Sequence, residues 1–172
     1  MSVALKNLSD YDAEAMPNAE SWNIGVVVAN WNPLITHKIY ESCYETLIKH
    51  GANPDKIYTA QVPGAFELPT AAKMLAANQN LDAVICLGCV IKGETKHDDY
   101  ISSAVANSLA QMGMISGKPI VFGVITANNE QQAIDRAGGK HGNKGVEAAQ
   151  TALKMIELGK SLTRKKATIG FA

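Results

Sequence analysis

A short polar turn between a predicted strand and a predicted helix carries the residues best suited to chemistry. The stretch from Leu87 to Tyr100 begins at the end of an apolar run, passes Gly93 and Thr95, and enters a helical pattern with His97 in its first turn. Free backbone N–H groups and the positive end of a helix dipole make such a turn an anion site. An unperturbed histidine titrates near neutrality, so His97 is suited to exchange protons with a bound ligand.

Alternating apolar runs and helical patterns must hold this turn in place. Strands are predicted at residues 24–29, 57–62, 83–90 and 119–125, and helices at 34–50, 68–77, about 97–117, 130–137 and 146–158. Residues 138–145 are rich in glycine and are expected to form a flexible loop. Because strands that alternate with helices form a parallel sheet through right-handed crossovers, the pattern predicts an α/β fold with helices on both faces.

Four turns follow the carboxyl ends of the predicted strands and should meet at one edge of the sheet. They span residues 31–32, 64–67, 92–97 and 126–129. The aromatic side chains of Trp31 and Phe66 suit a flat heterocycle, since stacking needs only a π-face. Glu67 is suited to accept hydrogen bonds from ring N–H groups, and Thr95 with the nearby N–H groups suits a phosphate. The sequence therefore predicts a pocket for a planar polar ring and a small phosphorylated partner.

Each of these residues also has a purely structural explanation. Taken alone, Trp31 is as readily a core aromatic, Phe66 a buried plug in its turn, and Glu67 a first-turn charge favoured by the helix dipole. Only the neighbouring groups favour a proton-transfer role for His97. The other candidate cations and histidines would pass for surface groups: Arg136, Lys144, His37, His50 and His141.

The composition narrows the class of protein. The chain has 172 residues, 47% of them hydrophobic, which suits one domain with a sizeable core. Lys and Arg total 16 and so do Asp and Glu, which argues against a nucleic-acid binder. No apolar run approaches the roughly 20 residues of a membrane span, no signal pattern starts the chain, and three cysteines imply no disulfide framework. We therefore expect a cytoplasmic protein that binds neither nucleic acid nor membrane.

The two ends of the chain differ from the predicted domain, which spans residues 23–160. Residues 1–22 are polar and weakly patterned, so we expect an extension outside the core that contacts a neighbouring subunit. Residues 161–172 form a tail that becomes basic and then small and apolar, and it is expected on the surface or against a partner.

Two short motifs suggest other chemistry but do not satisfy its geometry. Cys86 and Cys89 spell C-x-x-C, yet residues three apart in a strand point to opposite faces about 10 Å apart, too far for a disulfide. With no second pair for zinc, both are interpreted as core or pocket-lining thiols. The run from Gly88 to Thr95 resembles a nucleotide-triphosphate loop, but Glu94 stands where the phosphate-binding lysine is required. Nucleotide hydrolysis is therefore a weak alternative.

Five blocks of the sequence, in order and at familiar spacings, resemble the lumazine synthase family, which catalyses the penultimate step of riboflavin synthesis. The blocks are Asn30-Trp31-Asn32, Val62-Pro-Gly-Ala-Phe-Glu-Leu-Pro69, Leu87-Gly-Cys-Val-Ile-Lys-Gly-Glu-Thr-Lys-His97, Pro119-Ile-Val-Phe-Gly123 and Arg136-Ala-Gly-Gly-Lys-His-Gly-Asn-Lys-Gly-Val-Glu147. The resemblance covers residues 24–158 and implies a flavodoxin-like fold, a three-layer α/β/α sandwich with a four-stranded parallel sheet.

The resemblance also implies a reaction. The family condenses 5-amino-6-(D-ribitylamino)uracil with 3,4-dihydroxy-2-butanone 4-phosphate, without cofactor or metal. The products are 6,7-dimethyl-8-ribityllumazine, phosphate and water. These substrates match the pocket expected above, since one is a flat heterocycle and the other a small phosphate ester.

Roles for particular residues follow from the same resemblance. Trp31 matches the aromatic that stacks on the pyrimidine, and His97 matches the general acid/base. The segment that holds the ribityl chain is matched by Ala65, Phe66 and Glu67. The backbone that contacts the edge of the ring is matched by Cys89, Val90 and Ile91.

The phosphate is expected at a turn matched by Glu94 and Thr95, with Arg136 as the cation that pairs with it. Groups lent by the adjacent subunit are matched by Phe122, Arg136 and Lys144. Because the family assembles as pentamers or as larger shells, including icosahedral capsids, we expect at least a homopentamer, with riboflavin synthase as a further partner.

Three positions depart from the expected family pattern. Trp31 stands where phenylalanine is common, Asp98 where an aromatic usually follows the histidine, and Asn128 where an acid is expected.

Two other classes of protein stay open. A related binding protein would hold lumazine or flavin with little turnover, but the presence of His97, Arg136 and Lys144 favours the enzyme. An FMN-binding electron carrier would need a hydroxyl- and glycine-rich loop at residues 30–33, which this chain lacks.

Overall fold

A four-stranded parallel sheet forms the centre of the protein in the computed structural model, which describes residues 7 and 9–164. The strands lie in the order β2-β1-β3-β4. Their bounds are β1 (Ile24–Ala29), β2 (Ile57–Val62), β3 (Ala83–Ile91) and β4 (Ile120–Ala127). Every residue of β1 is buried, as a β-branched central strand covered on both faces requires.

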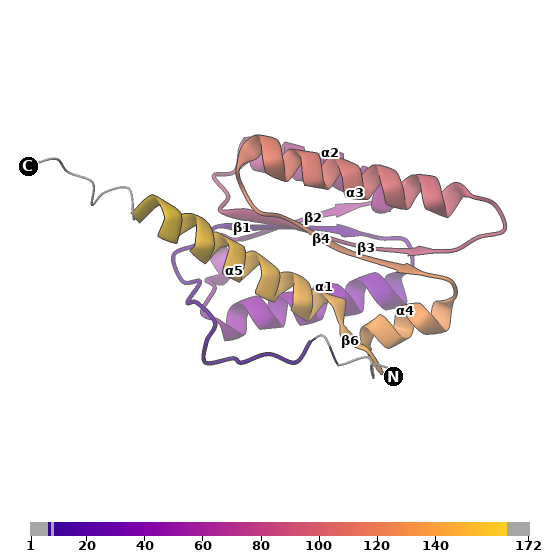
Figure 1. The fold of residues 1–172 in the computed structure, drawn as a ribbon, viewed down its shortest axis with the longest axis horizontal. Coiled ribbons are helices and arrows are strands. Elements are labelled where there is room, and N and C mark those ends of the chain that lie inside the picture. The colour runs from indigo at the N-terminus through magenta and orange to yellow at the C-terminus, as the bar shows by residue number, and fades with distance from the viewer. Residues whose placement is uncertain (1–6, 8, 165–172) are drawn as a thin grey trace, which may run out of the picture.

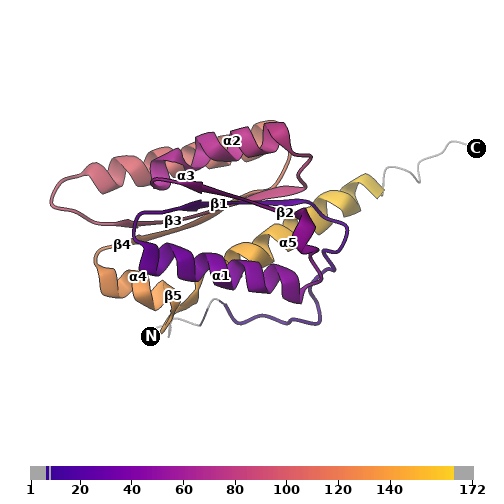
Figure 2. The ribbon, with the colours of Figure 1, turned by 180° about the vertical axis from the view of Figure 1, so that it is seen from behind.

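Helices cover both faces of the sheet and produce three layers (Figure 1). One face carries α2 (Leu68–Asn78) and α3 (His97–Ser116). The other carries α1 (Pro33–Lys49), α4 (Glu130–Arg136) and α5 (Lys144–Arg164), as the view from behind also shows (Figure 2). Two short 3-10 helices, η1 (Pro54–Lys56) and η2 (Ala65–Glu67), precede β2 and α2. The predicted α/β/α sandwich is confirmed.

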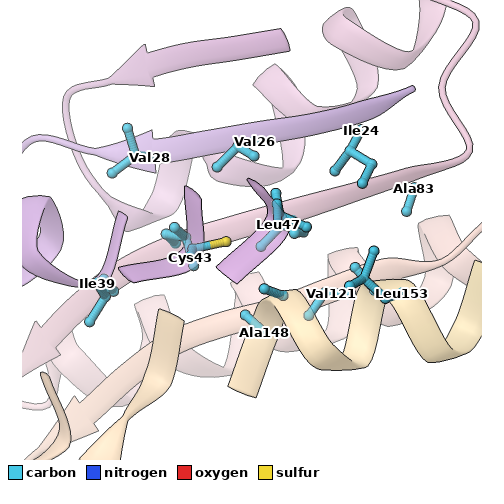
Figure 3. Close-up of a cluster of buried hydrophobic side chains, with 14 of the residues drawn as sticks. Ile24, Val26, Val28, Ile39, Cys43, Leu47, Ala83, Val121, Ala148 and Leu153 are labelled. Carbon is cyan, nitrogen blue, oxygen red and sulfur yellow. The ribbon is translucent and has the colours of Figure 1, made fainter. Parts of the chain in front are cut away.

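The larger part of the core lies between the sheet and the layer of α1 and α5 (Figure 3). Side chains of the sheet meet those of the two helices in this cluster: Ile24, Val26, Val28, Ala83, Val121, Ile39, Cys43, Leu47, Ala148 and Leu153. Burying one large apolar side chain stabilises the fold by about 1.5–3 kcal/mol. The turns at the ends of the strands therefore rest on a rigid base.

A second cluster fills the opposite face, beneath α2 and α3. Val105 and Leu109 of α3 are buried there against Val27 and Cys86 of the sheet. Cys89, three residues further along β3, belongs to the first cluster instead. The two thiols thus lie on opposite faces and are free, as predicted.

The segment before β1 belongs partly to the core. Ala19 and Trp22 are buried and pack into the larger cluster, so the expectation that residues 1–22 lie outside the core is wrong at these positions. The Tyr11 hydroxyl lies 2.8 Å from Nε2 of His50, which is therefore not a simple surface histidine. Residues 1–6, residue 8 and most of the predicted tail, 165–172, lie outside the described residues.

The glycine-rich stretch after α4 forms a small hairpin where a flexible loop was expected. In it β5 (Ala137–Gly139) pairs antiparallel with β6 (Gly142–Asn143). Gly138 and Gly142 have φ of 107° and 84°, a region that glycine enters without a steric penalty. The final helix begins at Lys144, two residues earlier than predicted, and continues to Arg164. Lys144 is therefore fixed at the start of a helix.

Candidate functional site

A pocket of about 270 Å³ lies at the carboxyl ends of β1 and β3. It is lined by Trp31, Asn32, Ala65, Cys89, Val90, Ile91, Gly93, Thr95, His97, Asp98 and Ile101. Three of the four turns expected at this edge contribute to the lining. The fourth contributes Thr126, Ala127 and Asn128 to a neighbouring pocket that shares Val90 and Asp98. All four turns therefore lie at one edge of the sheet, as expected, but only three of them line this pocket.

Trp31 presents its ring at the rim of this pocket. The side chain is 62% exposed, which excludes the explanation as a core aromatic. Its ring lies against Gly64, since a Cβ added at Gly64 would be 2.8 Å from Cε3 and 2.9 Å from Cζ3 of the indole. An exposed aromatic on a firm backing is suited to stack on a flat ligand.

Asn32 ties the first turn to the end of β3. It has φ 59° and ψ 56°, the left-handed region in which asparagine is tolerated better than most residues. Its Nδ2 donates to the carbonyl of Cys89 at 3.2 Å. Its own carbonyl accepts from the N–H groups of Ile35 and Thr36 at the start of α1. These bonds fix the position of the adjacent Trp31.

The turn after β2 supports the same corner of the pocket. Oε2 of Glu67 accepts a hydrogen bond from the Gly64 N–H at 3.0 Å, so this carboxylate holds the turn. Phe66 is 58% exposed and is therefore not a buried plug. Ala65 is buried and lines the pocket.

His97 is exposed at the first position of α3, on the pocket lining. Oγ1 of Thr95 accepts from the backbone N–H of His97 at 3.4 Å, and Oδ1 of Asp98 accepts from the N–H of Gly93 at 3.5 Å. Both bonds hold the loop, including the exposed Glu94, against the first turn of the helix. The positive end of a 20-residue helix thus faces the pocket.

The thiol of Cys89 lines the pocket but is not suited to act as a nucleophile. Burial raises its pKa to about 11, so the unreactive protonated form prevails at neutral pH. His97 is then the pocket group best suited to proton transfer. Over the described ranges, no group of three or more His, Cys, Asp or Glu is placed to hold a metal ion, and no helix is long and apolar enough to cross a membrane.

Arg136, the predicted phosphate-binding cation, and Lys144, predicted to be lent by the adjacent subunit, converge on Glu147. Nη2 of Arg136 lies 2.8 Å from Oε1 and 3.0 Å from Oε2 of this carboxylate, and Nζ of Lys144 lies 3.2 Å from Oε2. Nη1 of Arg136 also donates to the carbonyl of His141 at 2.6 Å. Two cations around one carboxylate leave an excess of positive charge, which suits a phosphate. Neither cation is a simple solvated charge.

Phe122 and Lys144 line a second depression, of about 720 Å³, between α3, β4 and α5. Glu147 lines it too, and none of the three lines the first pocket. One chain therefore separates the candidate residues into two sets. We name them the pocket group (Trp31, Ala65, Thr95 and His97) and the cation group (Phe122, Arg136, Lys144 and Glu147).

Asn32 and Glu147 have roles that sequence reasoning did not predict. For Asn32 the available signal is an asparagine directly before Pro33, because proline often starts a helix. For Glu147 it is the spacing of three residues from Lys144 within one helix, which brings the two side chains together. His141 also differs from expectation, since its Nδ1 is buried and has no hydrogen-bond partner among the residues that the structure describes.

The fold and the pocket define a class, flavodoxin-like α/β proteins that bind ligands at the carboxyl ends of parallel strands. The family model described as 6,7-dimethyl-8-ribityllumazine synthase matches residues 21–160. A protein of that name from Cytophaga hutchinsonii is 53% identical over 156 residues, 91% of this chain and 98% of the relative. A protein of the same name from Parabacteroides distasonis is 49% identical, over 91% of this chain and 98% of the relative. Another, from Flavobacterium johnsoniae, is 46% identical, over 90% of this chain and 82% of the relative. The chain belongs to the 6,7-dimethyl-8-ribityllumazine synthase family.

Proposed function

We propose that the protein condenses 5-amino-6-(D-ribitylamino)uracil with 3,4-dihydroxy-2-butanone 4-phosphate to 6,7-dimethyl-8-ribityllumazine, releasing phosphate and water, in riboflavin biosynthesis. The proposal rests on family membership and on one observation, the pocket that brings Trp31, Thr95 and His97 together. These residues supply a π-face, an anion-binding turn and a proton-transfer group. A flat heterocycle and a small phosphate ester require the same three groups.

Each part of the pocket takes one part of the substrates in this proposal. Trp31, backed by Gly64, stacks on the pyrimidine. The ribityl chain lies along the turn formed by Ala65, Phe66 and Glu67, and the ring edge lies against the backbone of Cys89, Val90 and Ile91. The phosphate lies at the turn that carries Glu94 and Thr95, where loop N–H groups and the dipole of α3 favour an anion.

His97 moves the protons in the proposed reaction. Forming an imine between the amine and the ketone requires protonation of the departing oxygen, and eliminating phosphate requires removal of a proton from carbon. A positioned general acid/base of this kind accelerates a reaction by about 10²- to 10⁴-fold. Holding the two substrates side by side supplies much of the remaining acceleration.

The cation group serves the pocket of a neighbouring subunit in this proposal. Support comes from its separation from the pocket group within one chain and from the apolar side chains exposed near both sets. Trp31 and Phe66 are 62% and 58% exposed on one side, and Met114 and Leu162 are 77% and 60% exposed at the second depression. Two unlike surfaces can pair head to tail, as the subunits of a ring do. With the resemblance, which implies pentamers and larger shells, this supports a homopentamer, with an icosahedral capsid as the larger assembly.

Light scattering tests the assembly, because a monomer at micromolar concentration would contradict it.

The proposed compartment is the cytoplasm, in keeping with three free cysteines. Riboflavin synthase, expected from the resemblance, is the proposed protein partner.

Turnover is the experiment that tests the reaction. Purified protein is mixed with the two substrates, and the fluorescent lumazine is followed over the slow uncatalysed background. We expect saturable product formation that falls by about 10²- to 10⁴-fold in His97→Ala. His37→Ala is the matched control, since His37 is exposed on α1 and lines neither the pocket nor the second depression.

Wild-type protein that makes no more product than the background would refute the enzyme. The pocket would then be a binding site for lumazine or flavin. Equal loss of rate in the His97 and His37 variants would instead refute the proton-transfer role of His97.

A further inference from the structure

Asn143 connects the hairpin that follows Arg136 to the helix that carries Lys144 and Glu147. It is only 7% exposed, and it joins β6 to α5 directly before Lys144. Its Oδ1 accepts from the N–H of Gly145 at 2.8 Å, the bond that caps the start of a helix. Its Nδ2 donates to Oγ of Ser42 on α1 at 2.9 Å. The side chain of Asn143 thus fixes where α5 begins.

The segment before β1 binds the backbone of the same asparagine. Oγ of Ser9 accepts a hydrogen bond from the N–H of Asn143 and donates one to its carbonyl at 3.2 Å. Nε2 of Gln150 on α5 donates to the carbonyl of Ser9 at 3.4 Å. A Cβ added at Gly142 would overlap Oγ of Ser9, so the segment packs directly on the hairpin. One hydroxyl therefore satisfies both backbone groups of a buried residue.

The hairpin connects this contact to both cations. Ala137, which follows Arg136, pairs with Asn143 across the hairpin. The carbonyl of His141 in its turn accepts the 2.6 Å bond from Nη1 of Arg136. A shift of Asn143 would move this carbonyl and the start of α5 together, and with them both charges. Misplacement of binding groups by about 1 Å is enough to weaken substrate positioning markedly.

We propose that Ser9 is a positioning residue for the phosphate-bearing substrate. Its hydroxyl fixes Asn143 and, through the hairpin, sets the places of the Arg136 guanidinium and the Lys144 ammonium. This inference rests on the proposed function, in which the cation group serves a neighbouring pocket, and on the excess positive charge of these two cations, which suits the phosphate. Without the hydroxyl, the N–H and carbonyl of Asn143 lose a partner, and the hairpin must shift to reach water. The kinetic effect falls on the butanone phosphate and not on the pyrimidine.

Ser9→Ala, compared with Tyr11→Phe in the full chain, tests this inference. Tyr11→Phe removes a hydrogen bond of the same segment, the 2.8 Å contact with His50 at the end of α1, and keeps the Ser9 hydroxyl that binds Asn143. In Ser9→Ala we expect the KM for the butanone phosphate to rise by about tenfold, with the KM for the pyrimidine within about twofold of wild type. Ser9→Thr, which keeps the hydroxyl, is expected to keep the KM for the butanone phosphate near the wild-type value.

Tyr11→Phe separates positioning from simple stability. It is expected to lower the melting temperature about as much as Ser9→Ala while leaving both KM values at the wild-type level. An unchanged KM for the butanone phosphate in Ser9→Ala, or an equal rise for both substrates, would overturn the inference alone. Absence of turnover in the wild type would overturn the proposed function and this inference together.

Discussion

Gly64→Ala is expected to weaken pyrimidine binding while leaving the fold intact. The backbone at Gly64 has φ −138° and ψ 179°, an extended conformation that alanine adopts freely. The added methyl would lie 2.8 Å from Cε3 and 2.9 Å from Cζ3 of Trp31, where ordinary carbon contacts are about 3.5–4.0 Å. The indole must therefore move by about 1 Å, and at 62% exposure it is free to turn toward solvent.

The size of the effect follows from the energy of stacking. A base stacked on an aromatic side chain gains about 1–3 kcal/mol. A displaced ring that loses about 1 kcal/mol of this raises the KM for the pyrimidine by about fivefold. The KM for the butanone phosphate is expected to stay at the wild-type value, because it does not depend on the exposed face of the indole. The added methyl would also lie 3.2 Å from Oε2 of Glu67, so a small fall in the melting temperature is expected.

Lumazine fluorescence measures both KM values, and a double-mutant comparison makes the result specific. In a Trp31→Phe background the smaller ring leaves room for the methyl, so the effect of Gly64→Ala should shrink. An unchanged pyrimidine KM in Gly64→Ala, or the same rise in both backgrounds, would refute the stacking role of Trp31.

Three further changes have expected outcomes. Glu147→Gln removes the carboxylate between two cations and should lower the free energy of unfolding in urea by about 1–3 kcal/mol. Asn32→Ala should destabilise by about 2 kcal/mol, and Asn32→Gly by less, because glycine keeps the left-handed backbone without strain. Burial raises the pKa of Cys43 and Cys86 to about 12 and that of Cys89 to about 11, whereas thiols in the unfolded chain have a pKa of about 8.5. Above about pH 9 the folded state therefore binds more protons than the unfolded state, and its stability falls as the pH rises. Urea unfolding should then need less denaturant at pH 10 than at pH 8.

The strands and most helices were predictable because their signals are local. β1 is a run of buried apolar residues, and α3 repeats Ile101, Val105 and Leu109 at helical spacing. The hairpin after α4 was not predictable, since three glycines suggest flexibility while its order comes from distant partners. Ser9 lies 134 residues from Asn143 along the chain, and no local pattern reports such a contact. The burial of Trp22 was missed for the same reason.

The candidate site was predictable in its residue types and less so in its geometry. Parallel strands end at one edge, so Trp31, Thr95 and His97 were expected to meet, and the pocket joins them. Thr126 to Asn128 follow the edge strand β4 and line the adjacent pocket instead. The pairing of Arg136 with Glu147 depends on how the hairpin turns the chain back, which spacing alone does not reveal.

The separation of the pocket group from the cation group has a genetic consequence. If each complete site uses the pocket group of one subunit and the cation group of the next, His97→Ala and Arg136→Ala damage different halves of it. Chains carrying one defect each, mixed during assembly, would regenerate intact junctions at about a quarter of the sites. Two inactive alleles would then complement each other in one cell, although neither allele by itself would support growth in the absence of riboflavin.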